Sequence, residues 1–139
     1  MAALVIAAAS VLWQSGPKLG DQVAGEAYDA GACIYLAANG KWLKAQADGT
    51  AIEAGSENIG MALGSADADG SRISVALPGA VVAVGTGTAG VVYCVGAVAG
   101  AYNPVADMAS TNKVTVAAQG IGTSRLQLAR DYNAGSVLA

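Results

Sequence analysis

The segment from Gly31 to Ala47 contains the feature that most constrains the fold, an Asn39-Gly40 pair between two runs that can form strands. Asn-Gly is typical of the two-residue turn of a β-hairpin, because that turn needs positive φ angles at both central residues. Counting outward from the turn pairs Ala37 with Trp42. The hairpin therefore predicts a protein built from antiparallel strands.

The predicted register sorts the side chains of this hairpin onto two faces, because side chains alternate along a strand. One face is apolar and is expected to enter the core. Its members are Ile34, Leu36, Leu43 and Ala45. The other face is amphipathic and is expected to meet water or a partner. Its members are Tyr35, Ala37, Trp42 and Lys44.

Further short runs that favour strands recur at spacings near ten residues, with turn signals such as Pro78-Gly79 between them. The run Arg72–Leu77 alternates cleanly, so its apolar residues are expected to point inward. The run Val91–Val95 is apolar throughout, so both of its faces are expected to be covered. The pattern is weak from Asp131 onward. The fold class expected is all-β, a small antiparallel β-sandwich or barrel with an extended N-terminal arm.

The chain divides into residues 1–20, an N-terminal arm or strand, and residues 21–139, a single β domain. Met1–Trp13 is the most apolar run. It is shorter than the roughly 20 residues that cross a bilayer, and no Lys or Arg precedes it as in a signal peptide. We interpret it as a strand or arm that docks either on its own fold or on a neighbouring subunit.

The composition points to a protein that works in an assembly. The chain is 54% hydrophobic but only 5% aromatic, and Ala and Gly make up more than a third of it. Small side chains bury little area each, so the core is expected to be thin and to gain stability from an oligomer. Only 12% of the residues are charged, which suggests that other chains cover much of the surface.

Several function classes lack the residues that they need. Seven basic residues in a chain of net charge −3 do not supply the clustered cations of a nucleic-acid site, so no nucleic-acid partner is expected. The absence of His removes the commonest general base and metal ligand. Cys33 and Cys94 are expected to be buried thiols in strands. We therefore predict no enzyme, no catalytic residue, no membrane partner, no cofactor and no metal.

Two motifs resemble ligand sites but have simpler interpretations. Gly85–Gly90 matches the dinucleotide fingerprint G-x-G-x-x-G, but a strand-like run follows it where the fingerprint needs a helix. We interpret it as a hairpin loop. Asp67–Gly70 lacks the further ligands of a calcium loop and is interpreted as a turn.

The order of the motifs resembles that of the small capsid decoration (cement) proteins of tailed bacteriophages. The likeness covers roughly residues 22 to 130. It is carried by Gly25–Gly31, Ile34–Leu36, the hairpin with Trp42, Ala45–Asp48, Asn58–Leu63, Arg72–Leu77, Gly90–Tyr93, Ala99–Pro104, Val114–Val116 and Arg125–Leu128.

This resemblance implies a β-rich protein that binds the outer surface of the phage head and clamps neighbouring major capsid subunits against internal DNA pressure. It would be made in the host cytoplasm and located on the virion. Its partners would be the major capsid protein and itself, as a homotrimer by preference or as a dimer. Leu12, Trp13, Tyr35 and Trp42 are the candidate contacts between subunits or with the capsid. The alternatives are an interaction domain of a tail fibre or spike and, third in order, a small-ligand-binding β-barrel.

Overall fold

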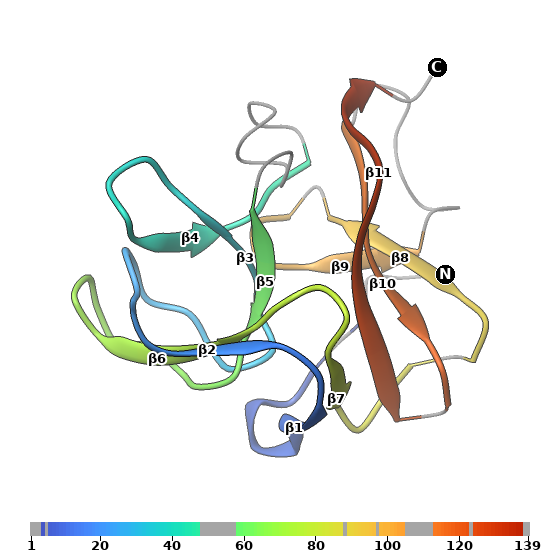
Figure 1. Ribbon diagram of the computed structural model, residues 1–139, viewed down its shortest axis with the longest axis horizontal. Helices are drawn as coiled ribbons and strands as arrows, with labels where there is room; N and C mark the ends of the chain where they lie inside the picture. Colours follow the sequence, from blue (N-terminus) through green and yellow to red (C-terminus); the bar gives the residue numbers. More distant parts are fainter. Residues whose placement is uncertain are drawn as a thin grey trace.

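The computed structural model describes residues 4, 6–47, 58–87, 89–96, 98–104, 113–122 and 124–137, and the side chains of these except 113–115 and 129–137. The described chain forms eleven strands and one short 3₁₀ helix, η1 (Ala8–Ser10). The strands form two antiparallel sheets that pack together (Figure 1). The expected all-β, antiparallel architecture is confirmed in its two-sheet form.

The larger sheet, sheet A, has six strands in the order β1-β7-β11-β10-β8-β9. Their bounds are β1 (Leu12–Ser15), β7 (Val81–Ala83), β8 (Val92–Val95), β9 (Tyr102–Pro104), β10 (Lys113–Gly120) and β11 (Arg125–Val137). The smaller sheet, sheet B, has the order β2-β6-β5-β3-β4. Its strands are β2 (Lys18–Val23), β3 (Cys33–Leu36), β4 (Trp42–Lys44), β5 (Ile59–Ala62) and β6 (Arg72–Ala76).

The N-terminal strands join the two sheets. β1 forms an edge of sheet A and β2 forms an edge of sheet B, so the chain changes sheet at Gly16-Pro17. Gly16 has a φ of +93°, and a Cβ there would lie 2.5 Å from the Ala80 Cα, so only glycine fits this corner. Of the two docking sites considered for this segment, β1 takes the one on its own fold. β2 also runs across residues 20 and 21, where the sequence placed a domain boundary.

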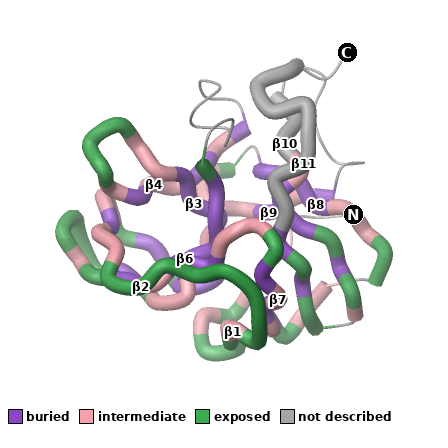
Figure 2. The backbone as a smooth tube through the Cα atoms, viewed as in Figure 1, coloured by how far each residue is buried: buried purple, intermediate pink, exposed green. Residues whose placement is uncertain are grey.

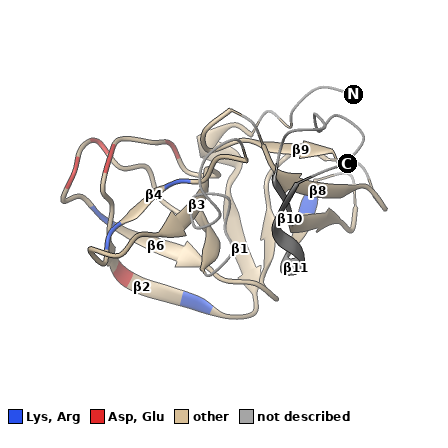
Figure 3. Ribbon diagram, turned by 90° about the horizontal axis from the view of Figure 1, so that it is seen from above, with Lys and Arg blue, Asp and Glu red and all other residues tan. Residues whose placement is uncertain are grey.

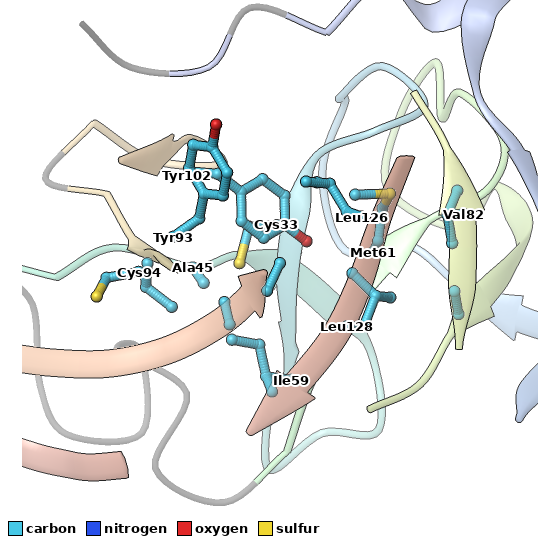
Figure 4. Packing of buried hydrophobic residues seen from close by; sticks show 14 of the residues in the cluster. Cys33, Ala45, Ile59, Met61, Val82, Tyr93, Cys94, Tyr102, Leu126 and Leu128 are labelled. Carbon is cyan, nitrogen blue, oxygen red and sulfur yellow. The ribbon is translucent and has the colours of Figure 1, made fainter. Parts of the chain in front are cut away.

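The main hydrophobic core lies between the sheets (Figure 4). Sheet B supplies Cys33 and Met61, and sheet A supplies Val82, Leu126 and Leu128. A second buried cluster lies on the other face of sheet B. It consists of Ala24, Tyr28, Ile34, Trp42, Ala62, Ala66, Ile73 and Val75. Sheet B is therefore covered on both faces by residues of this chain.

The predicted hairpin exists, but its register is shifted by one residue. Leu36 pairs with Trp42 and Tyr35 pairs with Leu43. The Ala37 N–H donates to the Lys41 carbonyl oxygen at 2.9 Å, and Gly40 has a φ of +81°. The loop thus has three residues, with glycine in the left-handed position, and not the two-residue turn that Asn-Gly favours. A one-residue shift moves side chains to the opposite face.

Other strand expectations are confirmed where the chain is described. In β6 the side chains of Ile73 and Val75 are buried while Arg72 is exposed. Most of β8 is buried, as expected of a strand covered on both faces. Gly79 has a φ of +100° and the Ala80 N–H donates to the Leu77 carbonyl at 3.0 Å, which confirms the Pro78-Gly79 turn.

The weakly patterned segment after Asp131 is part of a long strand. β11 continues to Val137 and pairs with β10 from the Lys113–Val137 contact down to Gly120–Leu126. The Gly85–Gly90 segment precedes a strand, as expected, but β7 and β8 are separated by β11 and β10 in sheet A. It is therefore a connection between distant strands and not a hairpin loop.

Candidate functional site

The shifted register places Trp42 in the cluster on the outer face of sheet B. The side chain is only 1% exposed, and its indole N–H donates to the Gln22 amide oxygen at 3.1 Å. The Trp42 carbonyl accepts from the Gly25 N–H at 2.8 Å and from the Tyr28 hydroxyl at 3.1 Å. Trp42 therefore holds the covering segment onto sheet B, and its predicted role as a surface contact is wrong for this structure.

Tyr35 is also placed differently from the expectation. It lies on the opposite face of the hairpin from Trp42, in the core between the sheets, and is 7% exposed. The expected amphipathic face that joined the two aromatic side chains does not exist. The burial of Trp42 on the outer face of sheet B and the burial of Tyr35 in the core both follow from the one-residue shift, because a slip of one position exchanges the two faces of a strand.

The other two predicted contacts lie on β1. Leu12 is 64% exposed and pairs with Ala83 of β7. Trp13 points the other way, packs in part against the inter-sheet core, and has the Lys18 ammonium 4.0 Å from the centre of its ring. Of the four predicted residues, Leu12 alone has an exposed apolar side chain at the surface.

Charged side chains gather on the sheet B half of the molecule (Figure 3). Among the described side chains, sheet A and its loops carry one charged residue, Arg125. The sheet B half carries Lys18, Asp21, Glu26, Asp29, Lys41, Lys44, Asp67, Asp69 and Arg72. Three ion pairs form there, Lys41–Asp69 at 2.8 Å, Lys44–Glu26 at 3.8 Å and Arg72–Asp21 at 3.3 Å. Such exposed pairs add little stability, but they keep this half well hydrated.

The outer face of sheet A has a different surface. Val81 pairs with Gln127, Gln127 with Gln119, and Gln119 with Val92. We call these four residues the outer row, because they cross β7, β11, β10 and β8 side by side on the face opposite the buried Leu126 and Leu128. The two glutamines are exposed and the two valines are partly exposed. The result is a neutral strip of amides and aliphatic side chains.

A second, shorter row lies beside the outer row. Leu12, Ala83 and Arg125 are paired across β1, β7 and β11. Arg125 is exposed and lies at the end of this row. The sequence reasoning missed the outer row. The alternation of Arg125–Leu128 marks Gln127 as outward, but the neighbour of Gln127 across the strands depends on the pairing of β11 with β10.

A groove at one end of sheet B has a volume of about 500 Å³. Its lining residues include Pro17, Leu19, Leu36, Leu77 and Pro78, with Asn58 at one side. A second cleft, of about 410 Å³, is lined by Tyr28, Asp29, Lys44 and Tyr102 together with small and apolar residues. Small-ligand sites combine an apolar pocket with several converging polar groups, and the groove lined by Asn58 and apolar residues does not have that combination.

The two thiols lie in the described core, as expected. Cys33 in β3 and Cys94 in β8 are both free and buried. Burial raises the pKa of Cys33 to about 12, against a smaller lowering by the Tyr102 hydroxyl, and burial raises the pKa of Cys94 to about 11. Burial also raises the pKa of Tyr102 and Tyr28. These groups stay neutral at pH 7, and neutral thiols are poor nucleophiles and metal ligands.

Among the residues that the structure describes, no three His, Cys, Asp or Glu side chains gather as metal ligands would. Asp67–Gly70 forms a turn, and Asp69 pairs with Lys41. The Thr50–Glu53 segment, which fits a helix-capping pattern, lies outside the described residues.

No protein-family model, curated protein or solved structure matches the chain. A search of the described residues for helices long and apolar enough to cross a membrane found none.

Proposed function

We propose that this protein is a structural component of a tailed-phage virion that binds the outer surface of the head and cements neighbouring major capsid subunits. In this proposal many copies cover the shell, and contacts between chains replace the stability that a small core lacks. The partners are the major capsid protein and further copies of this chain. The resemblance of residues 22 to 130 to capsid decoration proteins is the starting point.

The observation that carries the proposal is the uneven distribution of charge between the two sheets among the side chains that the structure describes. Surfaces that stay in water are normally rich in charge, whereas surfaces that meet other proteins are depleted in Lys, Asp and Glu. Nine of the ten described charged side chains lie on the sheet B half. In this proposal the sheet B half faces solvent and the sheet A half lies against neighbouring chains.

Exposed apolar side chains support the same division. Among the large apolar side chains that the structure describes as exposed, Leu12, Val98 and Ile121 belong to sheet A or its turns, and Leu19 belongs to sheet B. Val98 is 71% exposed in the turn between β8 and β9. Isolated exposed apolar residues are ordinary, but three on a half with little charge favour contact with protein. Leu12 keeps its predicted role as a contact in this proposal, and Tyr35 and Trp42 do not.

The copy number of the chain in purified particles tests the proposal. Stained-gel densitometry against the major capsid protein should give a near-stoichiometric ratio. A few copies per particle would contradict a cement role and would favour a tail fibre or spike. Absence from particles would remove the virion function and would return attention to ligand screens.

A further inference from the structure

The loop between β3 and β4 presents the Asn39-Gly40 pair to solvent. Both residues are exposed. Gly40 has a φ of +81°, which glycine adopts without strain, and a Cβ built on it would meet no atom within 4 Å. The surroundings of this peptide unit are therefore open, and nothing in the fold shields it from water or from attack by a neighbouring group.

The Asn39 side chain is folded back over its own main chain. Its Oδ1 accepts a hydrogen bond from the Lys41 N–H at 3.1 Å, which is the bond of an Asx turn. This bond closes across Gly40, so it holds the Asn39 carboxamide beside the Gly40 peptide nitrogen. A nucleophile and an electrophilic carbon held together in this way react more readily than they would in a free chain.

We propose that Asn39 is a site of spontaneous deamidation in the folded protein. The Gly40 nitrogen forms a bond to the carboxamide carbon of Asn39 and gives its proton to hydroxide. The bond from that carbon to Nδ2 breaks, and Nδ2 takes up a proton and leaves as ammonia. Water then opens the resulting succinimide ring at either carbonyl, which gives aspartate or isoaspartate. The net reaction consumes water and releases ammonia, without oxidation or reduction.

The Asx-turn bond also stabilises the charge that develops during this reaction. Oδ1 becomes negative when the nitrogen attacks, and the Lys41 N–H already points at that atom. Donors aimed in advance at developing charge lower a barrier. One contact opposes the reaction, because the Gly40 N–H donates to the Ala37 carbonyl at 3.0 Å. A single hydrogen bond in an exposed loop adds little net stability, so it opens locally and frees the nitrogen.

The other asparagine side chains that the structure describes lack these features. Asn58 precedes Ile59, whose β-branched side chain crowds its own nitrogen. Asn103 precedes Pro104, which has no N–H to lose. In the whole sequence Asn39 is the one asparagine that glycine follows. We therefore expect Asn39 to react before the others.

The isoaspartate product would alter the loop itself and not only its charge. The main chain would then run through the former side chain and be one atom longer, in a loop of three residues. The Ala37–Lys41 hydrogen bond closes the loop at its present length. Trp42 follows directly and holds the covering segment on sheet B. The isoaspartate form should therefore unfold at a lower urea concentration than the unmodified protein.

The reaction involves this loop alone and does not depend on the proposed function, so it is tested on the purified full chain without particles. The folded protein is incubated in mildly alkaline buffer and sampled over time. Peptide mapping by mass spectrometry, with fragmentation that distinguishes isoaspartate from aspartate, follows each asparagine. Loss of Asn39 should be at least about tenfold faster than loss of Asn58, which is the control within the same molecule.

Two variants complete the test. Asn39→Gln keeps a side-chain amide but would have to close a larger ring, so its release of ammonia should be much slower than that of the wild type. Asn39→Asp carries the new charge on a normal main chain. Its urea midpoint should lie near the wild-type value and above that of the isoaspartate form, which ion exchange separates from the unmodified protein. Circular dichroism should show that both variants fold.

Three results would overturn the inference. The first is an Asn39 that stays intact in the folded protein and is lost only in urea, because the bond from Gly40 to Ala37 would then protect the site. The second is loss of Asn39 no faster than loss of the other asparagines. The third is release of ammonia from Asn39→Gln at the wild-type rate. An isoaspartate form as stable as Asn39→Asp would overturn the predicted change in the loop.

Discussion

The outer faces of sheets A and B lie in the same small molecule and differ in burial: β5 of sheet B is buried along its whole length, whereas exposed and buried residues alternate along the described start of β11 in sheet A (Figure 2). On sheet B, Trp42 and Tyr28 are buried under a covering segment, and the loops around that cluster carry charge. On sheet A, the outer row is open and neutral. A sheet face can be covered by its own chain, hydrated by charged groups, or covered by another chain. The comparison suggests that sheet B is covered by its own chain and hydrated by charged groups, whereas sheet A is covered by another chain.

The largest predicted effect concerns the covered face of sheet B. Trp42→Ala should lower the free energy of unfolding by about 3–5 kcal/mol, because it leaves a large cavity and removes the hydrogen bond to Gln22. Urea denaturation measures this loss. Leu12→Ala, at an exposed site, is the control and should change stability by less than about 0.5 kcal/mol. A Trp42→Ala protein of normal stability that no longer binds particles would restore the surface role first predicted for this residue.

The second effect concerns the core that both sheets share. Cys33 and Cys94 have folded-state pKa values of about 12 and 11, whereas unfolded thiols have a pKa of about 8.5. The contribution of these two thiols to stability should be constant below about pH 8.5. It should then fall as the pH rises toward 11, because the unfolded thiols ionise first.

Each thiol should contribute about 1.4 kcal/mol per pH unit in this range. Urea midpoints at a series of pH values measure the slope. The double variant Cys33→Ala, Cys94→Ala should have a shallower slope up to about pH 10, where tyrosines begin to ionise in the unfolded chain. An unchanged slope would mean that the thiols are accessible to solvent in the folded protein.

The third prediction compares how strongly the sheet A half and the sheet B half contribute to capsid binding. Leu12→Asp should weaken binding to purified capsids by about tenfold, because it places a carboxylate on the sheet A half, and should leave the melting temperature unchanged. Leu19→Asp is the matched control, an exposed leucine on the edge strand of sheet B. It should bind within about twofold of the wild type. Equal losses for the two variants would contradict the division into halves.

The smallest effect concerns the corner between the sheets. Lys18→Ala removes the ammonium group that lies 4.0 Å from the Trp13 ring. The free energy of unfolding should fall by about 0.5 kcal/mol, as for an exposed cation–π pair. Lys18→Arg, which keeps the charge, should be close to the wild type in the same denaturation series. A loss above about 2 kcal/mol would mean that Lys18 has a larger structural role than this contact.

The sequence predicted the fold class well, because alternation and turn residues are local signals. The strand in Arg72–Leu77 and the turn at Pro78-Gly79 could each be predicted from the residues of that segment alone. The hairpin register was not predictable in the same way. Asn39-Gly40 fits both a two-residue turn and a three-residue loop with Gly40 in the left-handed position, and the choice depends on packing. That choice decides whether Trp42 is buried or exposed.

The candidate surface was less predictable than the fold. Gln127 can be assigned to the outside from its own strand, but the outer row exists only because β11 pairs with β7 and β10. Likewise, the segregation of charge onto one half depends on which strands share a sheet. Long-range pairing of this kind leaves no signal in local periodicity.

The most direct test of the account is the accessibility of the outer face of sheet A in assembled protein. Single cysteines replace Gln127 or, as a control in an exposed turn of the sheet B half, Ala68, and a maleimide labels them at pH 7. The native thiols stay silent because they are buried and un-ionised. The account predicts that Gln127→Cys reacts at least about tenfold more slowly in concentrated, assembled protein than after dilution, while Ala68→Cys reacts equally in both. Equal reactivity of Gln127→Cys in the two states would contradict the claim that another chain covers this face.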